Sequence, residues 1–134
     1  MTIVVAYAPG RYGRVAVDVG VALARRDGTD VVVVNGTRGD AYIDRRYAQR
    51  EELEEIRGVL EGSEVPFTLR QTMGADIADQ VIGVLNEVAG ALLVVGLRPR
   101  SPVGKMLLGS VAQQLLGDSP VPVLAVKPGQ VLSS

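Results

Sequence analysis

The sequence predicts an α/β protein in three layers, with a five-stranded, mainly parallel sheet and four helices on its two faces. Five short apolar runs recur along the chain, and four of them lack polar alternation, as do strands that are buried on both faces. Helical patterns separate these runs, so each strand is joined to the next by a right-handed crossover. The length of 134 residues suits one core, and we expect a single domain over residues 1–134.

The predicted strands are the most apolar stretches of the chain, and four of the five are rich in β-branched residues. They cover Thr2 to Tyr7, Asp30 to Asn35, Val65 to Gln71, Ala91 to Gly96 and Val121 to Lys127. The last strand contains Pro122, which cannot donate a ladder hydrogen bond and is tolerated mainly at sheet edges. We therefore expect this strand to form an edge, and an exposed edge rich in valine invites pairing.

The helices are predicted from apolar residues at helical spacing and from signals at their ends. They cover Arg14 to Arg26, Asp44 to Glu61, a third segment that Asp76 caps and Gly90 closes, and Ser110 to Leu116. The first is expected to stop at Asp27-Gly28, because glycine readily adopts the left-handed conformation that ends many helices.

Composition excludes several classes of function. The net charge of −1 provides no overall basic excess for nucleic acid or an anionic membrane. The absence of cysteine and histidine removes disulfides, thiolate metal sites and the commonest general base. No apolar run is long enough for a membrane helix and no signal peptide is recognisable, so a cytoplasmic protein is expected.

Three loops are expected at the carboxyl ends of the strands, where doubly wound sheets bind ligands. They are Ala8 to Gly13, Gly36 to Ile43 and Leu97 to Gly109. The second loop, with its two glycines, is interpreted either as a flap over a ligand or as a solvated connection.

The segment from Gly96 to Ser110 is the principal candidate for a ligand site. Gly96 allows a tight turn after a buried strand, and Gly109-Ser110 opens a helix whose N–H groups attract anions. The cations Arg98, Arg100 and Lys105 lie between these ends, so the segment suits a phosphate group. Spacing alone leaves another interpretation open, in which Gly96 only turns the chain, Ser110 caps the helix and the cations are solvated.

Two known phosphate motifs are excluded. A Walker A loop that ends at Gly104-Lys105 would need glycine at Pro99 and serine or threonine at Met106. A dinucleotide fingerprint would need a closer pair of glycines than Gly10 and Gly13, which are interpreted as turn residues.

The spacing of the last third of the chain is typical of a known family. In that family the fourth strand is followed by glycine, two residues, glycine, nine residues and then Gly-Ser or Gly-Thr, a spacing that Gly96, Gly109 and Ser110 match. The run Gly109-Ser-Val-Ala-Gln, the ending Pro120-Val-Pro-Val-Leu-Ala-Val-Lys-Pro128, and Gly74 with Ala78 also fit. The sequence therefore resembles the universal stress protein family over essentially the whole chain.

The resemblance implies an adenine-nucleotide alpha-hydrolase-like fold with strand order 3-2-1-4-5 and a homodimer formed through Val121 to Lys127. It also implies a stress-associated regulatory protein that binds ATP or another adenine nucleotide. The predicted nucleotide-binding positions are Gly96, Arg98, Arg100, Lys105, Gly109, Ser110, Val111 and Ala8, of which the three cations are chosen for their charge. If ATP is hydrolysed, Mg²⁺ would be held by its phosphates and by water.

Two positions depart from the family pattern. The second glycine is Pro99, which lacks an N–H donor, and an aspartate that engages the nucleoside is replaced by Ala8. A nucleotide-independent dimeric adaptor that acts through protein partners is therefore an alternative. A weak ATPase is the third hypothesis, although no catalytic set of side chains can be assembled from the sequence. A receiver domain is disfavoured by Tyr7-Ala8-Pro9 at a strand end where acids are required, and a flavodoxin by the few aromatic residues.

Overall fold

Valine fills the centre of the sheet on both of its faces. The computed structural model describes residues 1–37, 50–97 and 109–129. The strands are β1 (Thr2–Ala6), β2 (Val31–Thr37), β3 (Phe67–Met73), β4 (Gly90–Gly96) and β5 (Val123–Val126). They form one sheet in the order β3-β2-β1-β4-β5, and every neighbouring pair is parallel, which confirms the predicted fold and strand order.

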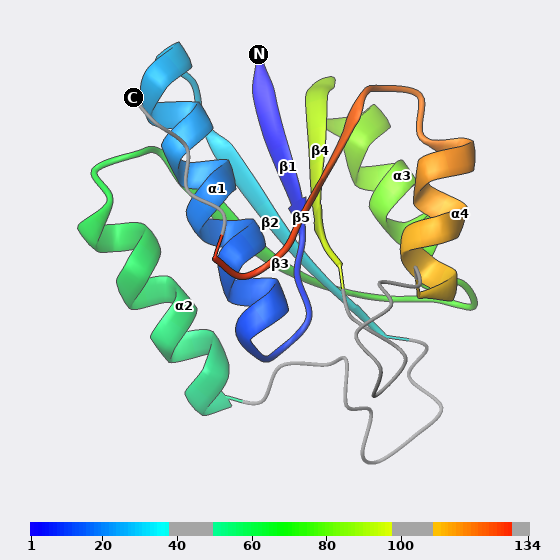
Figure 1. Cartoon of the computed structure of the whole chain (residues 1–134), viewed down its shortest axis with the longest axis horizontal. Coiled ribbons are helices and arrows are strands. Elements are labelled where there is room, and N and C mark those ends of the chain that lie inside the picture. The colour runs from blue at the N-terminus through cyan, green and yellow to red at the C-terminus, as the bar shows by residue number, and fades with distance from the viewer. Residues whose placement is uncertain (38–49, 98–108, 130–134) are drawn as a thin grey trace.

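The four helices lie in pairs on the two faces of the sheet (Figure 1). They are α1 (Arg11–Asp27), α2 (Arg50–Gly62), α3 (Ile77–Glu87) and α4 (Ser110–Asp118). One core cluster packs the odd-numbered residues of β1, such as Val5, against α1 and α2. The other packs Val4 and its neighbours against α3 and α4. Both valines have no exposed surface, so the sheet is buried on both faces as predicted.

Helix α1 begins three residues before its predicted start. Its N-cap is Gly10, whose φ of 111° lies in the region that favours glycine, and Gly13 is part of the first turn. The interpretation of Gly13 as a turn residue is therefore wrong. Gly28 ends the helix with φ 66°, and its N–H donates to Ala24 and Arg25, which confirms the predicted stop.

Helix α3 begins as predicted and ends earlier. The carboxylate of Asp76 accepts a hydrogen bond from the backbone N–H of Asp79, so the predicted cap is confirmed. The helix ends at Glu87, and Ala89 has the positive φ of 53°. Gly90 does not close the helix because it already starts β4, where an added Cβ would lie 2.8 Å from Leu85 Cδ2.

The remaining boundaries differ by a few residues. Strand β3 starts two residues later than predicted, because the N–H of Val65 donates to Ser63 Oγ in a turn. Strand β5 is confined to Val123–Val126, and α4 extends to Asp118. In the loop predicted at Gly36 to Ile43, Gly36 and Thr37 belong to β2, whereas residues 38–49, including the predicted start of the second helix, lie outside the described residues.

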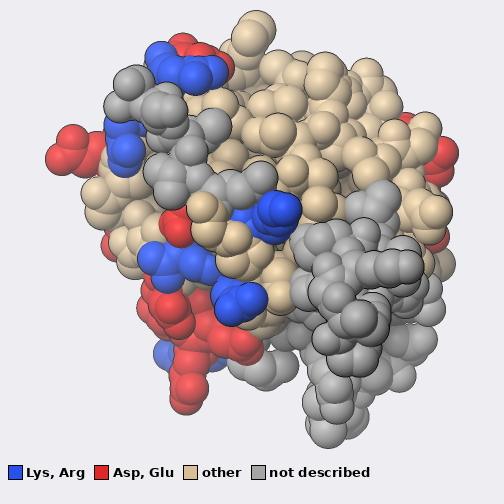
Figure 2. Space-filling model, viewed as in Figure 1, with Lys and Arg blue, Asp and Glu red and all other residues tan. Residues whose placement is uncertain are grey.

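Charge is mixed on the face shown in Figure 2, where acidic side chains gather over α2 and basic ones lie beside them. Arg14 of α1 forms ion pairs with Asp18 and, at 3.4 Å, with Glu55 of α2. Within the described part of the chain, no helix is both long and apolar enough to span a membrane.

Candidate functional site

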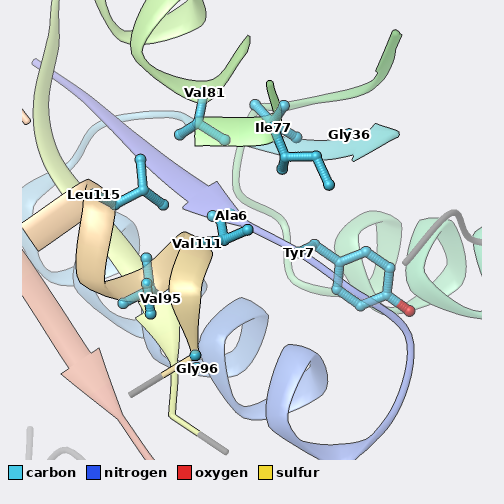
Figure 3. A pocket seen from close by; sticks show the side chains of 12 residues that line it. Ala6, Tyr7, Gly36, Ile77, Val81, Val95, Gly96, Val111 and Leu115 are labelled. Carbon is cyan, nitrogen blue, oxygen red and sulfur yellow. The ribbon is translucent and has the colours of Figure 1, made fainter. Parts of the chain in front are cut away.

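A pocket of about 90 Å³ opens at the carboxyl edge of the sheet, on the face that α3 and α4 cover (Figure 3). It lies over the ends of β1, β2 and β4. In the sheet, β2 and β3 lie on one side of β1, and β4 and β5 lie on its other side. The direction in which strands are added to the sheet therefore reverses between β1 and β4. Ligands of doubly wound folds bind at such a switch point.

The side chains that line the pocket are aliphatic, apart from that of Tyr7. The strands contribute Val34 and Val95, α3 contributes Ile77 and Val81, and α4 contributes Val111 and Leu115. The glycines at the strand ends, Gly36 and Gly96, bring backbone to the rim instead of side chains. The described part of the pocket therefore suits a flat apolar group that is bound by contact with aliphatic side chains.

The N-terminus of α4 forms one side of the pocket. Its N-cap is Gly109, with φ −64° and ψ 158°, and no described side chain caps this end. The first turn of a helix leaves backbone N–H groups without helical partners and carries a partial positive charge. The end of α4 therefore provides donors for an anion beside the apolar walls.

The N-terminus of α3 lies at the same edge but is already occupied by the chain itself. The Asp76 carboxylate caps it, and Gln114 Nε2 of α4 lies 3.4 Å and 3.5 Å from the two carboxylate oxygens. Asp76 therefore connects the two helices that enclose the pocket.

Side-chain amides hold the strand ends that form the rim. Asn35 has no exposed surface, donates from Nδ2 to the Tyr7 carbonyl at 2.9 Å and accepts from Gln71 Nε2 at 3.1 Å. On the opposite face of β2, Gln80 of α3 bonds to the ends of β2 and β3. The carboxyl edge beside the pocket is therefore fixed from both faces of the sheet.

Tyr7 lies at the end of β1 and turns its ring away from Val95 and Leu115 (Figure 3). The ring belongs to the core cluster of α1 and α2, and the residue is only 6% exposed. Burial raises the pKa of its phenol from 10.0 to about 12, with a further contribution from the negative charges of Glu52 and Glu55. Tyr7 is therefore neutral at physiological pH and contributes to the core.

The structure brings three of the residues predicted for the site together. Gly96, Gly109 and Val111 line the pocket. Ser110 is the first residue of α4 and is exposed, so its interpretation as the helix cap is wrong, because Gly109 holds that position. Ala8 does not line the pocket, and its carbonyl lies against Gly13. The cations Arg98, Arg100 and Lys105, together with Pro99, lie outside the described residues.

Glycine is required at position 96 because the first turn of α1 lies against it. A Cβ at this position would lie 2.3 Å from the carbonyl oxygen of Tyr12 in the first turn of α1, so only glycine fits. Gly36 begins one of the three loops that the sequence places at this edge, but neither Gly36 nor Gln80 is among the predicted site residues. Gly36 ends an apolar run and could have been found as a rim residue, whereas nothing in the local sequence marks Gln80.

The fold and the pocket define a doubly wound α/β protein with a ligand site at the switch point between β1 and β4. The model of the universal stress protein family matches residues 1–127, and the chain belongs to this family.

Related proteins agree with this assignment over nearly their whole length. A universal stress protein of Mycolicibacterium smegmatis is 47% identical over 126 residues, which are 94% of this chain and 97% of that protein. The structure of a universal stress protein from Archaeoglobus fulgidus matches with a TM-score of 0.78 at 26% identity, over 95% of this chain and 98% of that one. A universal stress protein crystallised in complex with cAMP matches with a TM-score of 0.74 at 25% identity, over 95% of this chain and 96% of that one.

Proposed function

We propose that this chain is a stress-associated regulatory protein that binds an adenine nucleotide at the carboxyl edge of its sheet. The observation that carries the proposal is a largely aliphatic pocket that ends on the N-terminus of α4, which no described side chain caps. The base would lie between the valines of the pocket, and the phosphates would accept hydrogen bonds from the first turn of α4. The complex of a family member with cAMP supports a ligand of this class.

The size of the pocket indicates which part of the ligand it accommodates. A volume of about 90 Å³ is well below the roughly 300 Å³ at the lower end of pockets for whole drug-sized ligands. We expect the base to fill it and the phosphates to lie outside, toward Arg98, Arg100 and Lys105 of the segment that follows β4. Mg²⁺ would then be held by the phosphates and by water. Among the described residues, no group of three acidic side chains could hold a metal ion.

Binding is tested by calorimetry with ATP, ADP, AMP and cAMP on the wild-type protein and on Gly109→Glu. The added carboxylate would compete for the N–H groups of α4 and repel phosphate, so we expect a loss of affinity of about a hundredfold, or about 2.7 kcal/mol. No described heavy atom lies within 4 Å of a Cβ built on Gly109, so the fold tolerates the change.

Gly83→Glu is the matched control. It introduces the same charge in the middle of α3, at an exposed position outside the pocket where an added Cβ likewise meets no described atom within 4 Å, and it should bind as the wild-type protein does. Equal affinity of Gly109→Glu and the wild-type protein would contradict the proposed site. A wild-type protein that binds none of the four nucleotides would contradict the proposed function.

The second candidate function is a nucleotide-independent adaptor, which is favoured by Pro99 and by Ala8 at positions where the family pattern has glycine and aspartate. If the protein is an adaptor, the Gly109→Glu variant should bind the protein partner with the same affinity as the wild-type protein does. The third candidate function is a weak ATPase, for which the wild-type protein should release phosphate from ATP faster than the Gly109→Glu variant does. Phosphate release at the same rate from both proteins would contradict this function.

We also propose that the protein is a cytoplasmic homodimer that pairs through the region Val121 to Lys127. Strand β5 is an edge of the described sheet, and its residues Val123, Leu124 and Ala125 are only partly buried. An unpaired edge with partly exposed valine and leucine is a surface that pairs readily. Analytical ultracentrifugation would test this proposal, and a monomer at micromolar concentration would contradict it.

A further inference from the structure

The side chain of Gln80 makes three hydrogen bonds, and all of them go to other segments of the chain. Its Oε1 accepts from Thr72 Oγ1 at 2.7 Å. Its Nε2 donates to the carbonyl of Thr37 at 2.9 Å and to that of Gly74 at 3.1 Å. One side-chain amide of α3 therefore binds the last residue of β2, the penultimate residue of β3 and the turn that follows β3.

A neutral amide side chain matches this set of partners. Its Nε2 carries the two hydrogens that the carbonyls accept, and its Oε1 accepts from the hydroxyl of Thr72. The Thr37 carbonyl also accepts the backbone N–H of Gly74 at 3.1 Å, so the end of β2 is bonded to one donor from the turn and to one from α3. The end of β2 would lose one of these two donors if Gln80 were replaced.

The Gln80 amide lies directly behind the rim of the pocket. A Cβ built on Gly36 would lie 2.9 Å from Gln80 Oε1 and 3.4 Å from Ile77 Cγ2. Gly36 and Ile77 both line the pocket, one from β2 and the other from α3. The packing of Gln80 against Gly36 therefore sets the separation between these two walls.

We propose that Gln80 is a positioning residue of the pocket, which holds the end of β2 at the distance from α3 that the ligand requires. Its effect on binding rests on the proposed nucleotide function. Its effect on the end of β2 does not, because the three hydrogen bonds are formed within the chain.

Gln80→Glu tests the inference with almost no change of shape. At neutral pH the carboxylate donates no hydrogen bond and faces the carbonyls of Thr37 and Gly74, so both bonds are lost. We expect the backbone N–H of Gly74 to exchange with solvent at least tenfold faster in the ligand-free protein, as measured by NMR. We expect the Kd for cAMP to rise about tenfold.

Asn86→Asp is the matched control, because it changes an exposed amide of the same helix into an acid away from the pocket. It should change neither the exchange of Gly74 nor the Kd. If Gln80→Glu does not fold, Thr72→Val serves as the second variant, because it replaces the hydroxyl that orients the amide by a methyl group. It should raise the exchange rate of the Gly74 N–H and the Kd for cAMP about threefold each.

The two measurements separate the possible results. Wild-type exchange of Gly74 in the variants would overturn the inference, whether or not cAMP binds. Faster exchange with an unchanged Kd would overturn the role of Gln80 in the pocket. Faster exchange in a protein whose wild-type form does not bind cAMP would leave the positioning of β2 intact and contradict cAMP as the ligand of the proposed function.

Discussion

The two faces of the sheet end differently at its carboxyl edge. On the face of α1 and α2, the first turn of α1 packs tightly at this edge, since a Cβ at Gly13 would lie 1.8 Å from the carbonyl oxygen of Ala8, two residues after the end of β1. Gly96 is in similarly close contact with the Tyr12 carbonyl. On the face of α3 and α4, a pocket separates the strand ends from the helices. The first face is closed by backbone contact and the second is open.

This difference shows that glycine has two uses in one fold. At Gly13 it lets α1 contact the segment that follows β1, and at Gly109 it leaves the end of α4 without a cap from any described side chain. The closed face contributes stability and the open face provides space for a ligand. Substitutions in the first turn of α1, on the closed face, should therefore affect unfolding most, and substitutions at the N-terminus of α4, on the open face, should affect binding most.

The largest expected effect is that of Gly13→Ala on the closed face. The new methyl group would overlap the Ala8 carbonyl and approach Tyr7 Cδ1 within 2.9 Å, so α1 would have to move away from the sheet. Overpacking of this kind costs about 3 kcal/mol of the free energy of unfolding. Urea denaturation measures the change.

Gly58→Ala and Gly83→Ala provide the control, because they lie within helices and no described heavy atom is within 4 Å of the added carbon. Alanine favours a helix over glycine, so each should stabilise the protein by up to about 1 kcal/mol. A Gly13→Ala protein as stable as these two variants would show that the face is not closed by contact.

A second prediction concerns the buried phenol of Tyr7 on the closed face. In the unfolded chain the phenol ionises near its ordinary pKa of 10.0, whereas in the folded protein it stays neutral up to about pH 12. This contribution to stability is therefore fully present below pH 10 and is lost as the pH rises from 10 to 12, by about 2 kcal/mol.

Tyr7→Phe isolates this contribution because it keeps the ring and removes the ionisation. The free energy of unfolding of the wild-type protein should fall below that of the variant between pH 10 and pH 12, and the difference between them should be constant below pH 9. Parallel pH curves for the two proteins would show that the phenol is not buried in solution.

The features of the fold that depend on residues close together in the sequence could be predicted. Runs of valine marked the strands, and Asp76 and Gly28 marked helix ends, because each acts on neighbours within a few residues. The strand order and the ligand class were expected from a family resemblance, and Gly96, Gly109 and Val111 do line one pocket.

Contacts between distant segments could not be predicted. Gln80 and its partner Thr37 are 43 residues apart in sequence, and no pattern near either residue indicates the other. The sequence predicts Gly96 as a turn and nucleotide-binding residue, but the backbone of Tyr12 already accounts for its missing side chain. Such close approaches depend on how the helices pack on the sheet, which a local pattern does not specify.

The smallest expected effect is on the open face, where Asp76 caps α3 with a carboxylate, whereas no described side chain caps α4. Asp76→Ala removes the side chain that accepts the Asp79 N–H and contacts Gln114, and should cost about 1 kcal/mol of the free energy of unfolding. Asp76→Asn keeps a good cap without the charge, so urea denaturation should find it close to the wild-type protein. If instead the asparagine variant loses as much stability as the alanine variant, the charge of Asp76 rather than its hydrogen bond stabilises the end of α3. The two helix ends would then differ in electrostatics more than in capping, and α4 would be the stronger anion site for that reason.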